Sequence, residues 1–270
     1  MTRWLLRFGY DGRGFSGWAR QPGRRTVEGE IGRGLRRFGI APTEGTGSVS
    51  VASRTDRGVS ARGNALALDS GLGGPALLRA MNGISPEIYF TAATRVPAEF
   101  RVRRSLGRSY RYFDATPIRS SRLRAAAIRR LRGRVDARSF GRAIPPSEPC
   151  WRTIELFDSR SVPGGTLLEV RAPSFVWGMV RKMVAAVREV DAGRITIEQL
   201  RSAVEGHARL SLPLAEPEPL VLWEVTYPLA WEFEWTGPNR HQVRHLAQER
   251  DALWARQQVL QLLPAPDSPS

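Results

Sequence analysis

The class of fold is decided by residues 153–171, TIELFDSRSVPGGTLLEVR. Residues 153–159 and 166–171 each alternate apolar and polar side chains, as expected of a strand with one buried face. Between them, Pro163-Gly164-Gly165 is a turn signal that joins neighbouring strands into a hairpin. Because hairpins connect antiparallel strands, this stretch predicts an antiparallel sheet and not a doubly wound parallel one.

The next residues, 175–190, form the clearest helix in the sequence. Their apolar side chains fall at i, i+3 and i+4 spacing along one face, namely Phe175, Val176, Met179, Val180, Met183, Val184 and Val187. The same periodicities predict further helices at residues 28–38, 77–82, 118–131 and 197–205. They predict strands at residues 3–10, 48–52, 64–69, 88–96, 110–115 and 220–227.

These elements give the order β-α-β-β-α-β in each half, with a break near residues 97–108. We therefore predict an α+β fold of two tandem ferredoxin-like subdomains, residues 1–103 and 104–230, with mainly antiparallel sheets and a central cleft. Residues 231–270 differ in composition and are predicted to be a C-terminal extension. Within it, residues 239–262 form a polar helix and residues 264–270 a disordered tail.

The composition indicates a polyanionic partner. The chain has 270 residues and a formal net charge of +15, from 41 basic and 26 acidic residues. Lys182 is the single lysine, so the other 40 basic residues are arginines. A GC-rich genome explains a preference for arginine over lysine, but that exchange leaves the charge unchanged. Because arginine binds phosphate through a planar fork and stacks on bases, the surplus charge favours nucleic acid.

Several other classes of protein do not fit the sequence. No run of about 18 apolar residues predicts a transmembrane helix, and the alternating N-terminus is unlike a secretory leader. Cys150 is the single cysteine, which excludes a disulfide framework and favours a reducing, cytoplasmic environment. His241 and His245 lie four residues apart, but no third ligand is near them. We therefore expect no metal site and no membrane partner.

The first candidate for chemistry is Asp56, in the loop SRTDRG at residues 53–58. Its carboxylate stands between Arg54 and Arg57, and two nearby cations favour the ionised form. An anionic carboxylate suits nucleophilic or electrostatic work better than proton donation. The alternative is a turn aspartate that caps its own backbone, and composition alone favours that alternative.

Two further candidates lie in regular structure. On a strand, Tyr110 and Tyr112 share one face and their neighbouring arginines the other, a pattern suited to base stacking and phosphate contact. Arg181 lies within the apolar stripe of the 175–190 helix, where a charge needs a partner or a function. The alternatives are core tyrosines with satisfied hydroxyls and an arginine that snorkels to the surface.

Together these residues resemble the tRNA pseudouridine synthases of the TruA family, from about residue 3 to residue 228. Collinear blocks carry the resemblance: Tyr10-Asp11-Gly12-x-x-Phe15-x-Gly17-Trp18-x-x-Gln21-Pro22, Thr26-Val27-Glu28-Gly29, Arg54-Thr55-Asp56-x-Gly58-Val59-x-Ala61, the segment 82–88, Phe100-x-x-Arg103 with Arg108-x-Tyr110-Arg111-Tyr112, and Ser174-Phe175 with Met179-Val180-Arg181. One Arg-Thr-Asp match alone is weak, whereas ordered blocks along most of the chain are specific.

The sequence departs from the family's pattern in places. Arg57 stands where alanine is usual, and Ser60 where histidine is usual. Glu28 replaces a glutamine and Val102 an alanine. These changes leave the aspartate, tyrosine and arginine in place but alter the surroundings of Asp56, which bears on which uridine is modified. Residues 231–270 have no counterpart in the family pattern.

The resemblance implies an isomerase that converts uridine to pseudouridine in tRNA, in the anticodon stem-loop at positions 38–40, without a cofactor. It implies that Asp56 is the nucleophile or base, that Arg181 pairs with it, and that Tyr110 packs against the target base. It also implies a homodimer. Six arginines are candidates for binding the RNA backbone: Arg20, Arg24, Arg25, Arg54, Arg57 and Arg108.

Two other functions fit part of the sequence. A non-catalytic tRNA-binding protein or RNA chaperone on the same fold would bind tRNA with a steep salt dependence whether or not Asp56 is present. A plain RNA-binding module would lack a base-sized pocket. A pocket that holds a carboxylate–guanidinium pair beside a tyrosine would argue against the plain module.

Overall fold

A computed structural model describes residues 1–40, 49–144, 150–235 and 239–262 of the chain. The fold is mixed α/β with a mainly antiparallel sheet, in agreement with the hairpin signal of residues 153–171. The described residues form one long sheet of nine strands and a separate sheet of two. The predicted tail at 264–270 lies outside the described residues.

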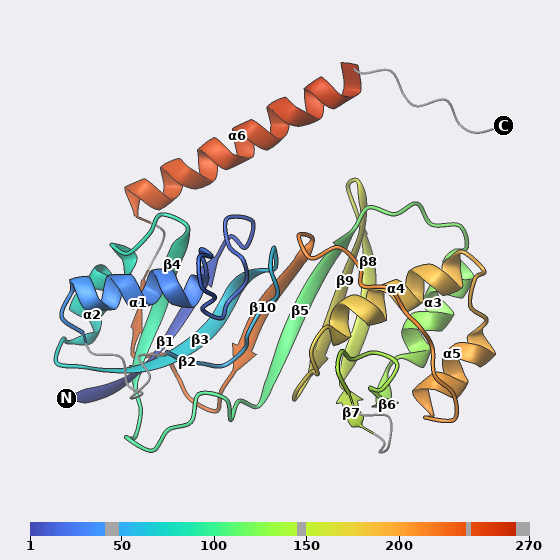
Figure 1. Ribbon diagram of the computed structural model, residues 1–270, viewed down its shortest axis with the longest axis horizontal. Coiled ribbons are helices and arrows are strands. Elements are labelled where there is room, and N and C mark those ends of the chain that lie inside the picture. Colours follow the sequence, from blue (N-terminus) through green and yellow to red (C-terminus); the bar gives the residue numbers. More distant parts are fainter. Residues whose placement is uncertain (41–48, 145–149, 236–238, 263–270) are drawn as a thin grey trace.

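The first half of the chain supplies one end of this sheet. Its strands are β1 (Thr2–Tyr10), β2 (Ser50–Val51), β3 (Ser60–Ser70) and β4 (Ile88–Arg95). Its helices, α1 (Val27–Arg37) and α2 (Gly74–Asn82), lie together on one side of the sheet (Figure 1). Thr26 caps α1, because its side chain accepts a hydrogen bond from the backbone N–H of Gly29.

The second half of the chain supplies the other end of the sheet. Its strands in the long sheet are β5 (Gly107–Asp114), β8 (Leu156–Val162), β9 (Gly165–Ala172) and β10 (Leu220–Thr226). Its helices are α3 (Ser121–Arg130), α4 (Met179–Asp191) and α5 (Ile197–Val204), which cluster beside the strands (Figure 1). The strand order β10-β5-β9-β8 corresponds, strand for strand, to β4-β1-β3-β2 in the first half.

The two halves meet where β10 lies beside β3. These two strands run parallel, with Val221 opposite Ser60 and Leu222 opposite Ala61. Strand β10 pairs antiparallel with β5 on its other edge. The start of β3, which follows the Asp56 loop, is thereby brought next to the second half of the chain.

Two sequence predictions need correction. The predicted strand at 153–159 is two strands, because β7 (Trp151–Ile154) pairs with β6 (Gly133–Asp136) in a separate small sheet while β8 pairs with β9. The predicted helix at 175–190 begins only at Met179. Gly178 directly precedes it with φ of +76°. This left-handed conformation cannot continue the helix toward the N-terminus, so residues 174–178 form a loop.

The last helix, α6 (Arg240–Leu262), projects from the first half of the molecule (Figure 1), where the sequence predicts a polar helix at 239–262. Gln242 anchors its first turn, because its buried Nε2 donates to Asn82 Oδ1 at 3.0 Å and to the carbonyl of Ile88 at 2.9 Å. The short strand β11 (Phe233–Glu234) leads to it along β4. None of the helices in the described ranges has the length and apolar composition needed to cross a membrane.

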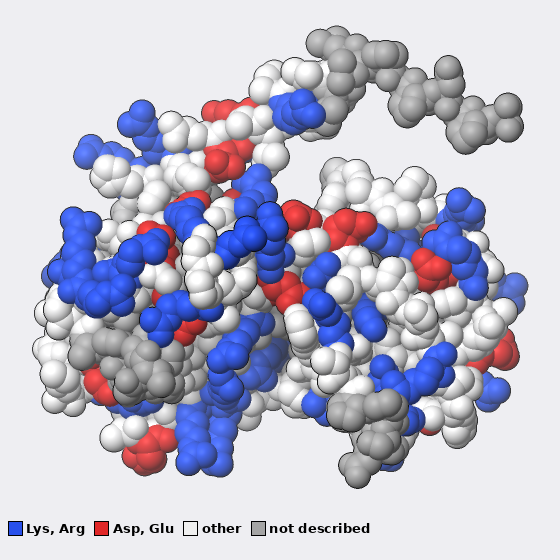
Figure 2. All heavy atoms as spheres, in the orientation of Figure 1, with Lys and Arg blue, Asp and Glu red and all other residues white. Residues whose placement is uncertain are grey.

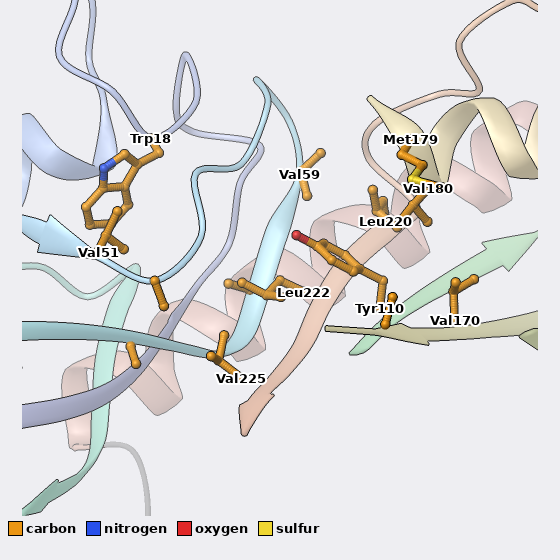
Figure 3. Packing of buried hydrophobic residues seen from close by; sticks show 14 of the residues in the cluster. Trp18, Val51, Val59, Tyr110, Val170, Met179, Val180, Leu220, Leu222 and Val225 are labelled. Atoms are coloured by element: carbon orange, nitrogen blue, oxygen red, sulfur yellow. The ribbon is translucent and has the colours of Figure 1, made fainter. Parts of the chain in front are cut away.

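One hydrophobic core runs through both halves. Figure 3 shows its middle, where Tyr110 of β5 extends toward Val59 beside Leu220 and Leu222 of β10. These side chains are all less than a tenth exposed, so the strand junction excludes water. The Asp56 loop and the start of α4 are therefore attached to a continuous packed core and not to a mobile linker.

A buried charge cluster fixes α3 and α4 to β5. Arg124 of α3 ion-pairs with Asp114 of β5, and its Nη1 lies 3.7 Å from Asp191 Oδ2 of α4. The three side chains are at most 4% exposed. Burial raises the pKa of Asp114, but its hydrogen bonds from Thr116 and the charge of Arg124 outweigh burial, so its pKa lies below the ordinary value.

We expect Arg124→Met to destabilise the protein by about 3 kcal/mol, because it leaves two buried carboxylates without their shared cation. Arg188 still contacts Asp114, which places the cost at the lower end of the usual range. Urea unfolding at pH 7 measures it. Arg129→Met, on an exposed position of the same helix, is the matched control and should change stability by less than about 0.5 kcal/mol.

The loss of stability caused by Arg124→Met should depend on pH in a definite direction. A carboxyl group whose pKa is lowered on folding stabilises the native state above its ordinary pKa and loses that effect as the pH falls. The difference between wild type and Arg124→Met should therefore shrink below about pH 4. A difference that grew on acidification would contradict this account of Asp114.

Candidate active site

Asp56 lies in the loop between β2 and β3. The loop turns at Gly58, whose φ of +82° is a left-handed conformation that favours glycine. The backbone N–H of Val59 donates to the carbonyl of Asp56 at 3.2 Å and closes the turn. The side chain of Asp56 is thus presented at the N-terminal end of β3, next to the strand junction.

Residues 10–18, the opening motif of the chain, hold this loop through hydrogen bonds. The hydroxyl groups of Tyr10 and Thr55 are hydrogen-bonded at 2.7 Å, and the backbone N–H of Trp18 donates to the carbonyl of Thr55 at 3.1 Å. Gly17 has φ of +93°, and a Cβ there would lie 3.1 Å from the backbone nitrogen of Arg57. Residues 10–18 therefore pack closely against the Asp56 loop and fix its conformation.

The structure also places the two departures from the family pattern that lie nearest to Asp56, first Ser60 and then Arg57. The Oγ of Ser60 accepts a hydrogen bond from the backbone N–H of Gly12 at 3.0 Å, so this serine ties the loop to the opening motif. The side chain of Arg57 is exposed. The first departure is thus structural, whereas the second adds a positive charge next to Asp56.

Arg181 pairs directly with Asp56. Its Nη1 donates to Asp56 Oδ2 at 2.9 Å, and the two side chains are only 12% and 22% exposed. The Nε of Arg181 donates to the carbonyl of Ala215 at 2.6 Å, which fixes the guanidinium in place. The predicted pair between the first and second halves is therefore present, and the snorkelling alternative for Arg181 is wrong.

A second arginine holds the segment that carries Ala215. Arg188 of α4 donates to Glu216 Oε2 at 2.6 Å and to Asp114 Oδ1 at 3.0 Å. The hydrogen bond from Arg188 lowers the pKa of Glu216 to about 2. A chain of contacts thus leads from the buried cluster around Asp114 to the backbone that orients Arg181.

Tyr110 lies beside this pair with its hydroxyl in a defined place. Its hydroxyl group and Ser53 Oγ are hydrogen-bonded at 3.0 Å, and Phe175 packs edge-on against its ring with the centroids 5.2 Å apart. Burial raises the pKa of Tyr110, so the hydroxyl remains protonated at neutral pH. A buried, protonated phenol next to a carboxylate can donate a proton or pack against a nucleobase.

These groups line a pocket of about 1190 Å³ between the two halves. Among its described lining residues, seven arginines stand against two acidic residues; they are Arg24, Arg54, Arg57, Arg103, Arg108, Arg142 and Arg181, with Asp56 and Glu218. Figure 2 shows many basic side chains near the middle of the face of the molecule that it displays. The pocket is larger than a typical small-molecule site of about 300–1000 Å³ and is suited to an anionic polymer.

The six predicted RNA-binding arginines fall into different environments. Arg24, Arg54 and Arg57 are exposed and line the pocket. Arg108 also lines it, but its guanidinium donates to the carbonyls of Ala52, Arg103 and Pro173. Arg20 and Arg25 are exposed and are not among the described lining residues.

Arg25 has its own partners outside the pocket. Its guanidinium is paired with Glu87 and lies 3.4 Å from Glu30. It also stacks over Phe15, with its Cζ 4.5 Å from the ring centroid. These contacts balance its charge locally and tie the loop before α1 to the start of β4.

Trp177 is a site residue that sequence reasoning missed. Its indole Nε1 donates to Asp56 Oδ1 at 2.7 Å, although 54% of the residue is exposed. In the sequence Trp177 falls inside the helix predicted at 175–190 but off its apolar stripe, so periodicity assigns it no role. The only sign of its role in the sequence is an aromatic residue directly before Gly178, the residue after which the helix begins.

Within residues 1–40, 49–144, 150–235 and 239–262, the structure contains no group of three or more His, Cys, Asp or Glu side chains that could hold a metal ion. The guanidinium of Arg181 and the indole of Trp177 donate to the Asp56 carboxylate, and the phenol of Tyr110 lines the same pocket. Such a set can position and attack an anionic substrate and can move protons.

The site therefore defines an enzyme whose carboxylate works inside a large, basic pocket. Comparison with known sequences agrees with this class. The profile of the family described as tRNA pseudouridine synthase matches residues 127–228. The tRNA pseudouridine synthase A of Thermococcus onnurineus is 34% identical over 228 residues, which cover 83% of this chain and 85% of that protein.

Two further relatives give the same result. The tRNA pseudouridine synthase A of Thermococcus sibiricus is 36% identical over 228 residues, covering 83% of this chain and 85% of the relative. That of Methanothrix thermoacetophila is 34% identical over 233 residues, covering 84% of each. The chain belongs to the tRNA pseudouridine synthase family.

Proposed function

We propose that this protein is a tRNA pseudouridine synthase, an isomerase that converts uridine to pseudouridine within tRNA. The observation that carries the proposal is the 2.9 Å ion pair of Asp56 and Arg181 in a basic pocket beside Tyr110. Membership of the family supports the same activity. A plain RNA-binding module has no need of such a buried pair, since desolvating it is costly.

We also propose that the two halves are tandem ferredoxin-like subdomains, residues 1–103 and 104–230, with residues 231–270 as an extension. The matching strand orders β4-β1-β3-β2 and β10-β5-β9-β8 support this division. The pocket at their junction is then the central RNA-binding cleft. One half contributes Asp56 and the other contributes Tyr110 and Arg181.

The reaction needs one bond exchange and no net transfer of electrons. The N1–C1′ bond of the target uridine breaks, the uracil turns, and C5 forms a new bond to C1′. C5 then loses a proton and N1 gains one, so atoms and charge balance without a redox or phosphoryl step. For this reason no cofactor is required.

The residues of the site divide this work. Asp56 is the proposed nucleophile toward the target nucleoside, through a transient bond that breaks again before the product leaves, and Arg181 orients its carboxylate. Tyr110 packs against the uracil, and its protonated hydroxyl serves in the proton transfers. Because a stacked base cannot reach the carboxylate, the target nucleotide must be extruded, at a cost of a few kcal/mol.

The arginines of the cleft supply the binding that offsets extrusion. We propose that Arg24, Arg54 and Arg57 contact backbone phosphates, since they are exposed within the pocket. Assignment of Arg20, Arg25 and Arg108 to RNA stays a prediction. We further propose action in the cytoplasm as a homodimer, on uridines of the anticodon stem-loop at positions 38–40.

Replacing Asp56 with alanine tests the activity. Asp56→Ala should abolish pseudouridine formation on unmodified tRNA, because the attacking group is removed while the cleft remains. Mass spectrometry of the RNA product measures it. Affinity for tRNA should stay within about threefold of wild type, since phosphate contacts dominate binding. Retained turnover by well-folded Asp56→Ala would refute the assignment.

The same assay separates the proposal from its alternative. A non-catalytic tRNA-binding protein would yield no pseudouridine with either the wild type or the variant, and both would bind tRNA equally. Mapping of the modified positions in the product would locate the target, and modification outside 38–40 would correct the proposed site without removing the activity.

The salt dependence of binding tests the cleft arginines. Arg57→Ala should weaken tRNA binding and reduce the slope of log K against log salt by about 0.7–0.9, the share of one phosphate contact. Arg129→Ala, an exposed arginine on α3, is the matched control and should leave the slope unchanged. Equal slopes for wild type and Arg57→Ala would place Arg57 away from the RNA.

A further inference from the structure

Asp56 has a second donor besides Arg181. The indole Nε1 of Trp177 donates to Oδ1 of Asp56 at 2.7 Å, whereas Arg181 donates to Oδ2 at 2.9 Å. Each carboxylate oxygen is therefore held by a different side chain. Both donors come from the segment 177–181, at the start of α4, but they approach opposite ends of the carboxylate.

Trp177 is held firmly although it is 54% exposed. The backbone N–H of Arg142 donates to the carbonyl of Trp177 at 2.8 Å, and the Cζ of Arg142 lies 4.0 Å from the centroid of the indole ring. The stem of Arg142 fills the space beside Gly178, where a Cβ would come within 3.2 Å of it. The indole is thus clamped by backbone and by cation–π contact.

The single lysine of the chain completes the clamp. Lys182 Nζ donates to the carbonyl of Gly141 at 3.0 Å, which fastens the loop that carries Arg142 to α4. The clamp therefore runs from Lys182 through Gly141 and Arg142 to Trp177, and from the indole to Asp56. Burial of the core does not account for the position of Trp177, because 54% of this residue is exposed.

Hydrogen bonds to both oxygens fix the plane of the Asp56 carboxylate, which a hydrogen bond to one oxygen would not do. The torsion that turns the carboxylate of an aspartate is broad and has no sharp rotamer, so the plane of the group is set by its hydrogen bonds. A carboxylate offers about four lone-pair sites, and the two donors occupy one on each oxygen. The plane is fixed while lone pairs remain free for the substrate.

We propose that Trp177 is a positioning residue that fixes the plane of the Asp56 carboxylate through its indole N–H, with Arg142 as the clamp that holds the indole. The proposal rests on the proposed pseudouridine synthase activity. It assigns the loop 174–178 a role in the rate of the chemical step. A group that orients the nucleophile acts on turnover and not on the affinity for tRNA.

The test compares Trp177→Phe with the wild type in steady-state pseudouridine formation. Phenylalanine keeps an aromatic ring against Arg142 but has no N–H. We expect kcat to fall about tenfold, as for loss of one hydrogen bond to a charged group, with KM for tRNA within twofold. Trp254→Phe, an exposed tryptophan on α6, is the matched control and should change neither constant.

A second variant addresses the clamp. Arg142→Met keeps the backbone hydrogen bond and the indole but removes the guanidinium, so kcat should fall by less than in Trp177→Phe. Melting temperatures of all three variants should match the wild type. Trp177→Phe with kcat within twofold of wild type, or with a loss confined to KM, would overturn the proposal. Inactive wild-type protein would instead refute the proposed function.

Discussion

The ion pair between Asp56 and Arg181 is the interaction on which the rest of the structure depends. It joins a loop of the first half to a helix of the second, across the parallel junction of β3 and β10. A partly buried carboxylate and guanidinium are stable there because they pair with each other and because Trp177 and the carbonyl of Ala215 supply further hydrogen bonds. The continuous core beneath them, with Tyr110 at its centre, keeps the two halves in fixed register.

Supporting contacts reach this pair from both directions. On one side, Tyr10 and Gly17 shape the loop around Thr55 and Asp56. On the other, Arg188 holds Glu216, whose neighbour Ala215 orients Arg181. The chemistry of a single carboxylate thus rests on segments spread over more than two hundred residues. Preorganisation of this kind fixes the geometry of attack before the substrate arrives.

The sequence predicted the parts of the fold that depend on local pattern. Alternation located β1, β4 and β9, and the Pro163-Gly164-Gly165 turn correctly predicted the hairpin. The motif spacing singled out Asp56, Tyr110 and Arg181, which the structure brings together in one pocket. It did not predict the break between β7 and β8, because both alternate and only pairing with different partners separates them.

Trp177 was missed for a related physical reason. It lies off the apolar stripe of the helix predicted at 175–190, and in the structure it lies in the loop before the left-handed Gly178, where its indole donates to Asp56. The local environment of an arginine is equally invisible in sequence. Arg25 and Arg57 are the same type of residue in the sequence, but in the structure Arg25 is paired with Glu87, whereas Arg57 lines the pocket.

The central claim is that Arg181 orients Asp56 for attack, and the single-turnover rate of pseudouridine formation in Arg181 variants at saturating enzyme tests it most directly. Arg181→Met, which keeps the length of the side chain but no donor, should lower that rate by at least about 100-fold. Arg181→Lys should fall in between, since an ammonium restores the charge but not the fork. A rate for Arg181→Met within twofold of wild type would contradict the account.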